Sequence, residues 1–281
     1  AVGDSRAESQ LEMARRIHLS LESFWDLKED AAKAGIRMMV SGFGPQSNAF
    51  LRSLNLGWWK VPSGEVTNVP YLREIGSAGQ RVFLSTGLAT LAEVGEAIQI
   101  LESSGAASAD ITILHCNSSY PTPLQDVNLR AMDTMRREFG REVGYSDHTL
   151  GWETSVAAVA LGARVIEKHL THDAGAIGPD HAASLEPDDF AAMVRSIRNV
   201  EDALGHGRKE PHPGEDEMRI VARRSIVARR PIGRGQIITG EDLAAKRPGV
   251  GITPFLWDSV IGSRATQDYL PDECIQWSLE E

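Results

Sequence analysis

Short apolar segments alternate with helix-like stretches over the first 204 residues, and this alternation limits the possible folds more than any other feature of the chain. We predict six strands from segments that are apolar or rich in β-branched residues: Ile36–Ser41, Trp58–Pro62, Arg81–Ser85, Ile111–Cys116, Val143–Asp147 and Arg164–His169. Strands that alternate with helices are typical of parallel β/α units. The carboxyl ends of such strands gather at one edge, where functional residues collect.

Helix signals fall between these strands. Thr90 and Glu93 form a capping box in front of an apolar face made of Val94, Ala97, Ile98 and Leu101. Another helix is predicted between a Ser20 cap and a Gly35 stop, with Leu21, Phe24, Leu27 and Ala31 at helical spacing, and an amphipathic one over Asp188–Leu204. A closed (β/α)8 barrel needs eight such units. We therefore predict an α/β fold of the TIM-barrel type that lacks two βα units.

The character of the sequence changes after Leu204. Residues 205–220 are polar and rich in glycine and proline, which is typical of a linker. Short β-rich pieces follow, separated by turns: Arg224–Ala228, Gln236–Ile238, Ser263–Ala265 and Cys274–Ser278. We predict a partial barrel domain over 1–204, a linker over 205–220 and a small β domain over 221–281.

Composition excludes several classes of function. The net charge is −10 without a basic stripe, so we expect no nucleic-acid partner. No apolar run approaches 18 residues, so we expect no membrane partner. The two cysteines, Cys116 and Cys274, lie far apart and give no disulfide framework. Since the first ten residues also have no signal-peptide core, we expect a cytoplasmic protein.

Two predicted strands end in a histidine beside a carboxylate. One finishes in Ser146-Asp147-His148 and the other in Glu167-Lys168-His169. A single histidine at a strand end is more often a hydrogen-bonded structural residue than a metal ligand. Two histidines from successive strands, at the edge where carboxyl ends gather, favour a divalent-metal site. If His169 faces the barrel interior, Lys168 faces outward onto the helices, because side chains alternate along a strand.

The strand ends also offer a lysine and several hydroxyls: Ser41, Lys60, Ser63, Ser85, Ser118, Tyr120 and Ser146. Several hydroxyl donors, helix N-termini and one ammonium group suit a phosphate ligand. Lys60 by itself could instead form a Schiff base with a carbonyl substrate. The same residues therefore allow two kinds of barrel chemistry.

Seven motifs follow one another along almost the whole chain: WWKVPSGEVTNVPYL (58–72), FLSTGLATLAEV (83–94), LHCNSSYPTPLQDVNLRAM (114–132), GYSDHTLG (144–151), VIEKHLT (165–171), GPDHAASLEP (178–187) and KRPGVGITP (246–254). In this order they resemble the N-acetylneuraminate synthase family, which includes bacterial sialic-acid synthases and their legionaminate, pseudaminate and spore-coat-polysaccharide relatives. The resemblance implies a metal-dependent barrel followed by an antifreeze-like (SAF) β domain. It also implies condensation of phosphoenolpyruvate with an N-acetylated mannosamine-type sugar, giving a nonulosonic acid and phosphate.

The resemblance assigns a role to each matching position. It implies that His148 and His169 hold Mn²⁺ or Mg²⁺ and that phosphoenolpyruvate contacts Lys60, Ser63, Ser85, Ser118 and Ser146. Ser41 stands where the family usually has threonine, in a Ser-Gly-Phe that replaces Thr-Pro-Phe. Glu65, Tyr120 and Asp180 are implied to contact the sugar, and Glu65 is our candidate for proton transfer. Arg247 is implied to reach the pocket of the partner subunit in a domain-swapped homodimer.

In the family, two βα units precede the first strand found here, and they supply an acid, an asparagine-containing loop and a second phosphate-binding lysine. We expect that they precede residue 1 in the full protein or have been lost. Two alternatives stay open. One is a Schiff-base aldolase that uses Lys60, and the other is a non-catalytic sugar-binding protein in which the tail domain recognises the ligand.

Overall fold

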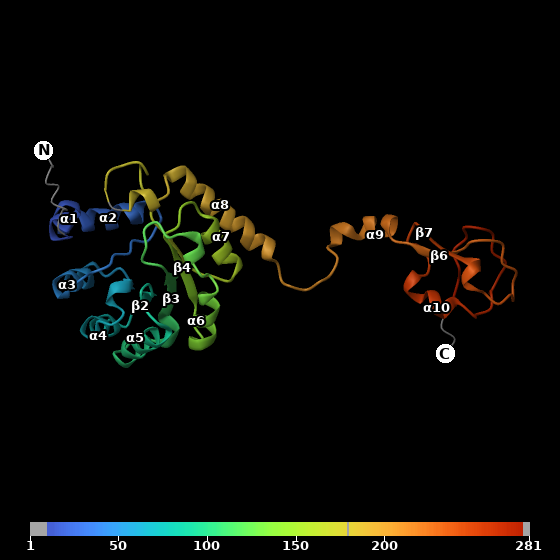
Figure 1. The fold of residues 1–281 in the computed structure, drawn as a ribbon, viewed down its shortest axis with the longest axis horizontal. Helices are drawn as coiled ribbons and strands as arrows, with labels where there is room; N and C mark the ends of the chain where they lie inside the picture. Colours follow the sequence, from blue (N-terminus) through green and yellow to red (C-terminus); the bar gives the residue numbers. More distant parts are fainter. Residues whose placement is uncertain (1–9, 179, 278–281) are drawn as a thin grey trace. The chain divides into compact units, whose positions relative to one another are not determined.

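The computed structural model describes residues 10–178 and 180–277, and it divides into two compact units between Gly205 and His206. The first unit is built on a curled sheet of five parallel strands, ordered β1-β2-β3-β4-β5 (Figure 1). The strands are β1 Trp58–Val61, β2 Arg81–Ser85, β3 Ile111–Cys116, β4 Val143–Asp147 and β5 Ile166–Lys168. Each strand pairs with the next one along the chain, so their carboxyl ends share one edge.

The segment Ile36–Ser41, predicted as the first strand, is not part of this sheet. Ile36 and Met39 are exposed. The carbonyl of Met38 accepts a hydrogen bond from the side chain of Trp58, at 2.7 Å, rather than from a neighbouring backbone. A strand needs backbone partners along its length, and this segment is instead attached to β1 through one indole ring. The structure thus has five strands in the sheet where the sequence predicted six.

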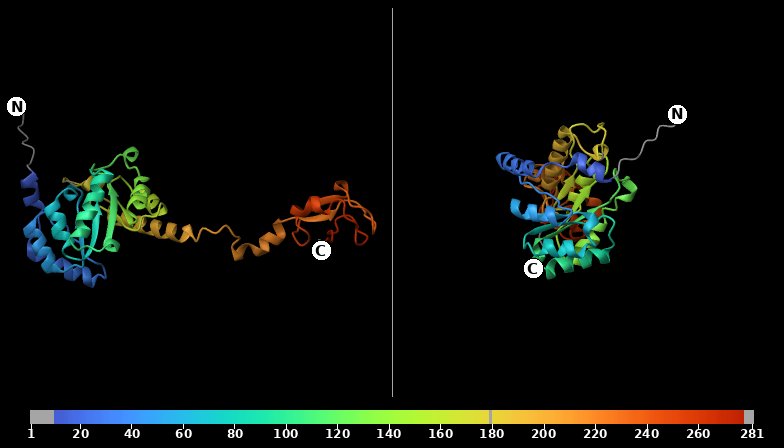
Figure 2. Two further views of the ribbon diagram at one scale, coloured as in Figure 1. Left: turned by 90° about the horizontal axis from the view of Figure 1, so that it is seen from below. Right: turned by 90° about the vertical axis from the view of Figure 1, so that its left-hand side faces the viewer.

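Sequence signals predicted three helices, and the described residues form ten α-helices. They are α1 Gln10–Ile17, α2 Leu21–Lys33, α3 Pro45–Leu54, α4 Val69–Gly76, α5 Leu91–Ser103, α6 Ala131–Phe139, α7 Glu153–Ala160, α8 Pro187–Leu204, α9 Asp216–Ala222 and α10 Trp257–Val260. Helices α4, α5 and α6 follow the outer side of the sheet, as the turned views also show (Figure 2).

Three helices test the capping and periodicity signals in the sequence. Both hydrogen bonds of the capping box between Thr90 and Glu93 are present, and the whole predicted apolar face of α5 is buried. Helix α8 begins one residue before the predicted Asp188 and buries Met193 and Ile197. Helix α2 starts after the Ser20 cap as predicted, but none of its residues is fully buried. Its apolar stripe contacts the core only through the half-buried Phe24.

The core of the first unit lies between the sheet and helices α3 to α7. Apolar residues from β1 to β4 pack there against buried side chains of α4 and α5, such as Leu72, Ile75, Ala97 and Leu101. This packing fixes the strands and leaves their carboxyl ends to position polar groups. Within residues 10–178 and 180–277, no helix is long and apolar enough to cross a membrane.

The second unit is a small β-rich fold. Strands β6 Ser225–Ala228 and β7 Leu243–Lys246 form an antiparallel pair over their own apolar core. The other predicted β pieces make isolated bridges, Ile237 with Arg264 and Cys274 with Val227, while Ser278 lies outside the described residues. Helix α9 begins inside the segment that was predicted as a linker.

Candidate functional site

Lys60, Ser146 and Glu167 meet at the carboxyl edge of the sheet. The Nζ atom of Lys60 lies 3.2 Å from Oε1 of Glu167, and the hydroxyl of Ser146 donates to the same oxygen at 2.8 Å. Lys60 stands on β1 and Glu167 on β5, the two outer strands of the sheet. A direct contact between them requires the sheet to curl until its inner face closes around these side chains. Ser146 and Glu167 are also register partners between β4 and β5.

A second group surrounds the backbone of Gly87, just after β2. The Gly87 N–H donates to Ser63 Oγ at 3.0 Å and lies 3.2 Å from Cys116 Sγ. A Cβ atom at position 87 would lie 2.5 Å from Ser118 Oγ and 2.9 Å from Ser63 Oγ. Glycine at 87 therefore keeps open a small space between two serine hydroxyls, and an anion could accept hydrogen bonds there. The structure thus brings the hydroxyls of Ser63 and Ser118 to the same place.

Ser85 is buried, and within the described part of the chain its hydroxyl has no hydrogen-bond partner. The same is true of Asn117 Oδ1. Buried polar atoms without a partner are rare because each costs about 1–3 kcal/mol. Ser85 is the last residue of β2, two residues before Gly87, so its unsatisfied hydroxyl fits a site that is completed by a polar ligand.

The two histidines lie together, with Tyr120 against both. The ring centroids of His148 and His169 are 5.3 Å apart, and Tyr120 lies 4.1 Å from His148 and 5.7 Å from His169. His148 Nδ1 donates to the carbonyl of Asn117 at 2.7 Å. This bond fixes the tautomer and leaves the Nε2 lone pair available, which is the usual arrangement of a metal-binding histidine.

Burial lowers the pKa of His148, although the hydrogen bond to Asn117 opposes this shift, and so the ring is neutral near pH 7. Burial likewise raises the pKa of Tyr120, and the negative groups nearby add to the effect. Both groups are thus held in uncharged forms. A neutral imidazole is the form that binds a metal ion.

Within the described ranges, 10–178 and 180–277, no group of three or more His, Cys, Asp or Glu side chains is arranged to hold a metal. Asp180 lies beside the pair, with Oδ2 3.9 Å from His169 Nδ1. Both residues line a cavity of about 300 Å³ with His181 and Ser184. The side chains present fit a divalent ion held by two imidazoles, with the remaining positions left for water or substrate oxygen.

Three other predicted site residues lie in different surroundings. Glu65 follows β1 in a short 3-10 helix, where its carboxylate accepts a hydrogen bond from Asn68. Ser41 lines a separate apolar cavity of about 400 Å³ together with Phe43 and Phe50, so it is not grouped with Lys60. Arg247 belongs to the second unit, where its Nε donates to the carbonyl of Ala222 at 2.9 Å.

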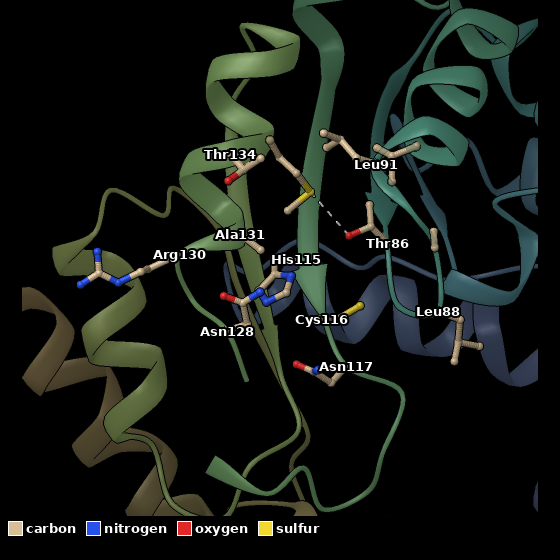
Figure 3. A pocket seen from close by; sticks show the side chains of 13 residues that line it. Thr86, Leu88, Leu91, His115, Cys116, Asn117, Asn128, Arg130, Ala131 and Thr134 are labelled. Atoms are coloured by element: carbon tan, nitrogen blue, oxygen red, sulfur yellow. Dashed lines mark hydrogen bonds between the residues drawn. The ribbon is translucent and has the colours of Figure 1, made fainter. Parts of the chain in front are cut away.

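A cavity of about 460 Å³ lies beside this site, between the ends of β2 and β3 and the starts of α5 and α6 (Figure 3). Its lining includes Thr86, His115 and Thr134, and Thr86 Oγ1 donates to Met135 Sδ at 3.8 Å. None of the site residues predicted from the sequence lines this cavity. Cys116 is shared, since its sulfur also contacts the group around Gly87.

Sequence reasoning noted Glu167 beside His169 but gave it no role, and it did not single out Gly87. The position of Glu167 could have been found from strand alternation, because Glu167 and His169 are two residues apart and face the same side. Gly87 carried no comparable signal. Its importance comes from Ser63 and Ser118, which are brought near it only by the fold.

Comparison with known proteins identifies the family. The model of the NeuB family matches residues 2–209, and that of the SAF domain matches residues 223–279. The chain belongs to the NeuB family. This confirms the resemblance found from the sequence motifs.

Two curated relatives illustrate the range of the family. The chain is 42% identical to the N,N'-diacetyllegionaminic acid synthase of Campylobacter jejuni, over 96% of this chain and 80% of the relative. It is 36% identical to the N-acetylneuraminate-9-phosphate synthase of Homo sapiens, over 84% of this chain and 65% of the relative.

Solved structures of related proteins also match this chain. An N-acetylneuraminic acid synthetase from Leptospira borgpetersenii, in complex with citrate, matches with a TM-score of 0.70 and 31% identity, over 76% of this chain and 74% of that chain. A putative spore coat polysaccharide biosynthesis protein E from Chromobacterium violaceum matches with a TM-score of 0.76 and 23% identity, over 98% of this chain and 82% of that chain. The second match supports the fold alone.

Proposed function

We propose that this NeuB-family chain condenses phosphoenolpyruvate with an N-acetylated mannosamine-type sugar to give a nonulosonic acid and inorganic phosphate. The observation that carries the proposal is the pairing of a lysine–serine group with two adjacent imidazoles at one edge of a curled parallel sheet. The curated relatives named above are synthases of acids of this class. We further propose that the sheet is part of an eight-stranded β/α barrel.

The phosphate of phosphoenolpyruvate would lie among Lys60, Ser63, Ser118 and the Gly87 N–H. Two observations support this place: the hydroxyls of Ser63 and Ser118 lie around Gly87, and the hydroxyl of Ser85, at the end of β2, has no partner in the described part of the chain. Glu167 keeps the Lys60 ammonium directed into the site. An anionic ligand would gain charge-assisted hydrogen bonds from Lys60, which are about twice as strong as neutral ones.

The sugar would lie on the histidine side of the site, beside Tyr120 and Asp180, with Glu65 as the group that transfers a proton. We propose that His148 and His169 hold Mn²⁺ or Mg²⁺. When bound there, the ion would supply a Lewis acid for the aldehyde oxygen of the sugar. The hydrogen bond from His148 Nδ1 to Asn117 would hold the ring so that Nε2 faces the ion.

The reaction forms one carbon–carbon bond and one carbon–oxygen bond, from water to C2, and breaks the C2–O bond to phosphate. Of the two protons of the water, one ends on the new hydroxyl and the other on phosphate. C3 of phosphoenolpyruvate attacks the aldehyde carbon of the sugar, whose oxygen takes up a proton and becomes a hydroxyl. Water adds to C2, and its oxygen stays as the keto oxygen when the C2–O bond breaks and phosphate leaves with the electron pair. We propose that Glu167, which contacts both Lys60 and Ser146, orients the water that attacks C2.

The test of this function is phosphate release from phosphoenolpyruvate by the full-length protein, with N-acetylmannosamine, its 6-phosphate and 2,4-diacetamido-6-deoxy sugars offered separately. We expect release only when one of the sugars is present. Phosphoenolpyruvate labelled with ¹⁸O in its bridging oxygen should give labelled phosphate. Label left in the organic product, or release without any sugar, would contradict the proposal.

A trapping experiment on the same full-length protein distinguishes this function from that of a Schiff-base aldolase. Borohydride added with pyruvate traps a lysine adduct only in the aldolase case. We expect no adduct at Lys60 and a loss of activity with EDTA. An adduct that is lost in Lys60→Arg would favour the aldolase instead.

We also propose a domain-swapped homodimer in which Arg247 serves the site of the partner subunit. Residues 205–215, which precede α9, are polar and long enough for the tail unit to reach away from its own sheet. Mixing inactive Lys60→Ala and Arg247→Ala chains tests this arrangement. In a swapped heterodimer one site keeps both residues, so part of the activity should return, whereas tails that serve their own sheets would leave every site defective.

A further inference from the structure

The carboxyl ends of β4 and β5 carry polar residues on both faces of the sheet. Ser146 and Glu167 bond to each other on the site face, where the rings of His148 and His169 also meet. Asp147 and Lys168 are register partners one residue further along and therefore point to the opposite face. Two strands thus present reactive groups on one side and an ion pair on the other.

The Asp147–Lys168 pair is completely buried. Both side chains are 0% exposed, and Lys168 Nζ lies 3.4 Å from Asp147 Oδ1. The carboxylate accepts five further hydrogen bonds, from the N–H and hydroxyl of Thr149 at 2.8 Å each, from Thr154 Oγ1 at 2.9 Å, from Ser155 Oγ at 2.6 Å and from the Tyr145 hydroxyl at 3.4 Å. The pair therefore ties β4, β5 and the first turn of α7 together.

These contacts fix the backbone next to both histidines. Thr149 is held at its N–H by Asp147 and at its carbonyl by Lys168, which donates to that oxygen at 2.6 Å. His148 lies between the two held residues, Asp147 and Thr149, and His169 directly follows Lys168. Neither charged group reaches the site face, so neither can touch a substrate.

Stability alone is a poor explanation for such a pair. The cost of removing two charges from water offsets most of their attraction, and replacing both partners with uncharged groups is often neutral or stabilising. Geometry is the better explanation, because the orientation of two adjacent rings depends on the backbone that carries them.

We propose that Asp147 and Lys168 are positioning residues that set the separation and direction of the His148 and His169 rings, and thereby the affinity of this pair for a divalent ion. The inference rests on the proposed function, since the ion is the one that we assign to the two histidines. It predicts that the pair controls metal affinity without controlling whether the chain folds.

The test uses Mn²⁺ alone, titrated by calorimetry into the full-length protein without substrates, alongside thermal unfolding. The main variant is the double substitution Asp147→Asn with Lys168→Met, which removes both charges and leaves none unpaired. The control is Asp242→Asn in the second unit. Asp242 is also buried and accepts hydrogen bonds from Thr239 and Arg230, but it lies in the other unit.

We expect the double variant to unfold within a few degrees of the wild type and to bind Mn²⁺ at least about tenfold more weakly, as is typical when support behind a metal ligand is lost. Asp242→Asn should bind Mn²⁺ like the wild type. A double variant that is stable and binds Mn²⁺ within twofold of the wild type would overturn the inference. If the double variant does not fold, Ser155→Ala removes one donor to Asp147 and keeps both charges, and an unchanged affinity in that variant would overturn it equally.

The metal assignment is judged separately by His148→Ala. Loss of Mn²⁺ binding in His148→Ala, together with unchanged binding in the double variant, would reject the positioning role and leave the proposed function standing. A wild-type chain that binds no Mn²⁺ would reject the positioning role and the assignment of Mn²⁺ to the two histidines, while the phosphate-release assay would still decide the proposed function.

Discussion

Replacing Lys60 with methionine should weaken binding of phosphoenolpyruvate far more than binding of the sugar. The Lys60 side chain is about one-tenth exposed, and its ammonium group contacts Glu167 Oε1 at 3.2 Å. Methionine fills much of the same space without the charge. A hydrogen bond to a charged group contributes about 1.5–3 kcal/mol, so the dissociation constant should rise roughly tenfold to 150-fold.

The structure predicts a second part of this effect. Without Lys60, the carboxylate of Glu167 loses its ion-pair partner, keeps only the hydrogen bond from Ser146 and lies beside the phosphate as a like charge. The double variant Lys60→Met with Glu167→Gln removes that repulsion, so it should bind phosphoenolpyruvate more tightly than Lys60→Met alone. It should not recover wild-type affinity, because the cation is still missing.

The assay is equilibrium binding of phosphoenolpyruvate and, separately, of the sugar found by the phosphate-release experiment. Lys28→Met is the control, because Lys28 is a half-buried lysine on α2 that donates to the carbonyl of Leu54. Equal weakening for both ligands would refute the phosphate role of Lys60. A double variant weaker than Lys60→Met would refute the repulsion argument.

Three further predictions follow from the geometry. His148→Ala and His169→Ala should each abolish measurable Mn²⁺ binding in calorimetry, because each removes one of two imidazole ligands; unchanged affinity in both would place the ion elsewhere. Gly87→Ala should raise the KM for phosphoenolpyruvate without preventing folding, since the new methyl group would lie 2.5 Å from Ser118 Oγ; a wild-type KM would show that this space is not used. Burial lowers the pKa of His115 below its usual 6.5, so the ring takes up a proton more readily in the unfolded chain, and stability should fall as pH drops through 6.5. Urea unfolding of His115→Gln between pH 7 and pH 5 should show a smaller loss than the wild type, and an equal loss would contradict the shift.

Strand positions were the most predictable part of the fold. The segments that became β2, β3 and β4 were predicted with the observed bounds, because each is a short apolar run between clear helix signals. Ile36–Ser41 has the same apolar character and failed because pairing requires a neighbour, which composition does not reveal. The capping box at Thr90 succeeded for the opposite reason, since its two hydrogen bonds lie within four residues.

The candidate site likewise has one part that the sequence predicts and one part that it does not. Nearness of His148 and His169 could be predicted, because both follow neighbouring parallel strands by one residue and so reach the same edge and face. The contact between Lys60 and Glu167 could not be predicted, because β1 and β5 are separated by three strands and meet only when the sheet curls.

The alternation of side chains along β4 and β5 links the inner and outer faces of the sheet. Whatever sets His148 and His169 on the inner face must also place Asp147 and Lys168 on the outer one, so a site of two histidines on adjacent strands comes with two positions behind it that need to be filled. Here they are filled by opposite charges that bond to the backbone of Thr149, which makes the outer face a support for the inner one.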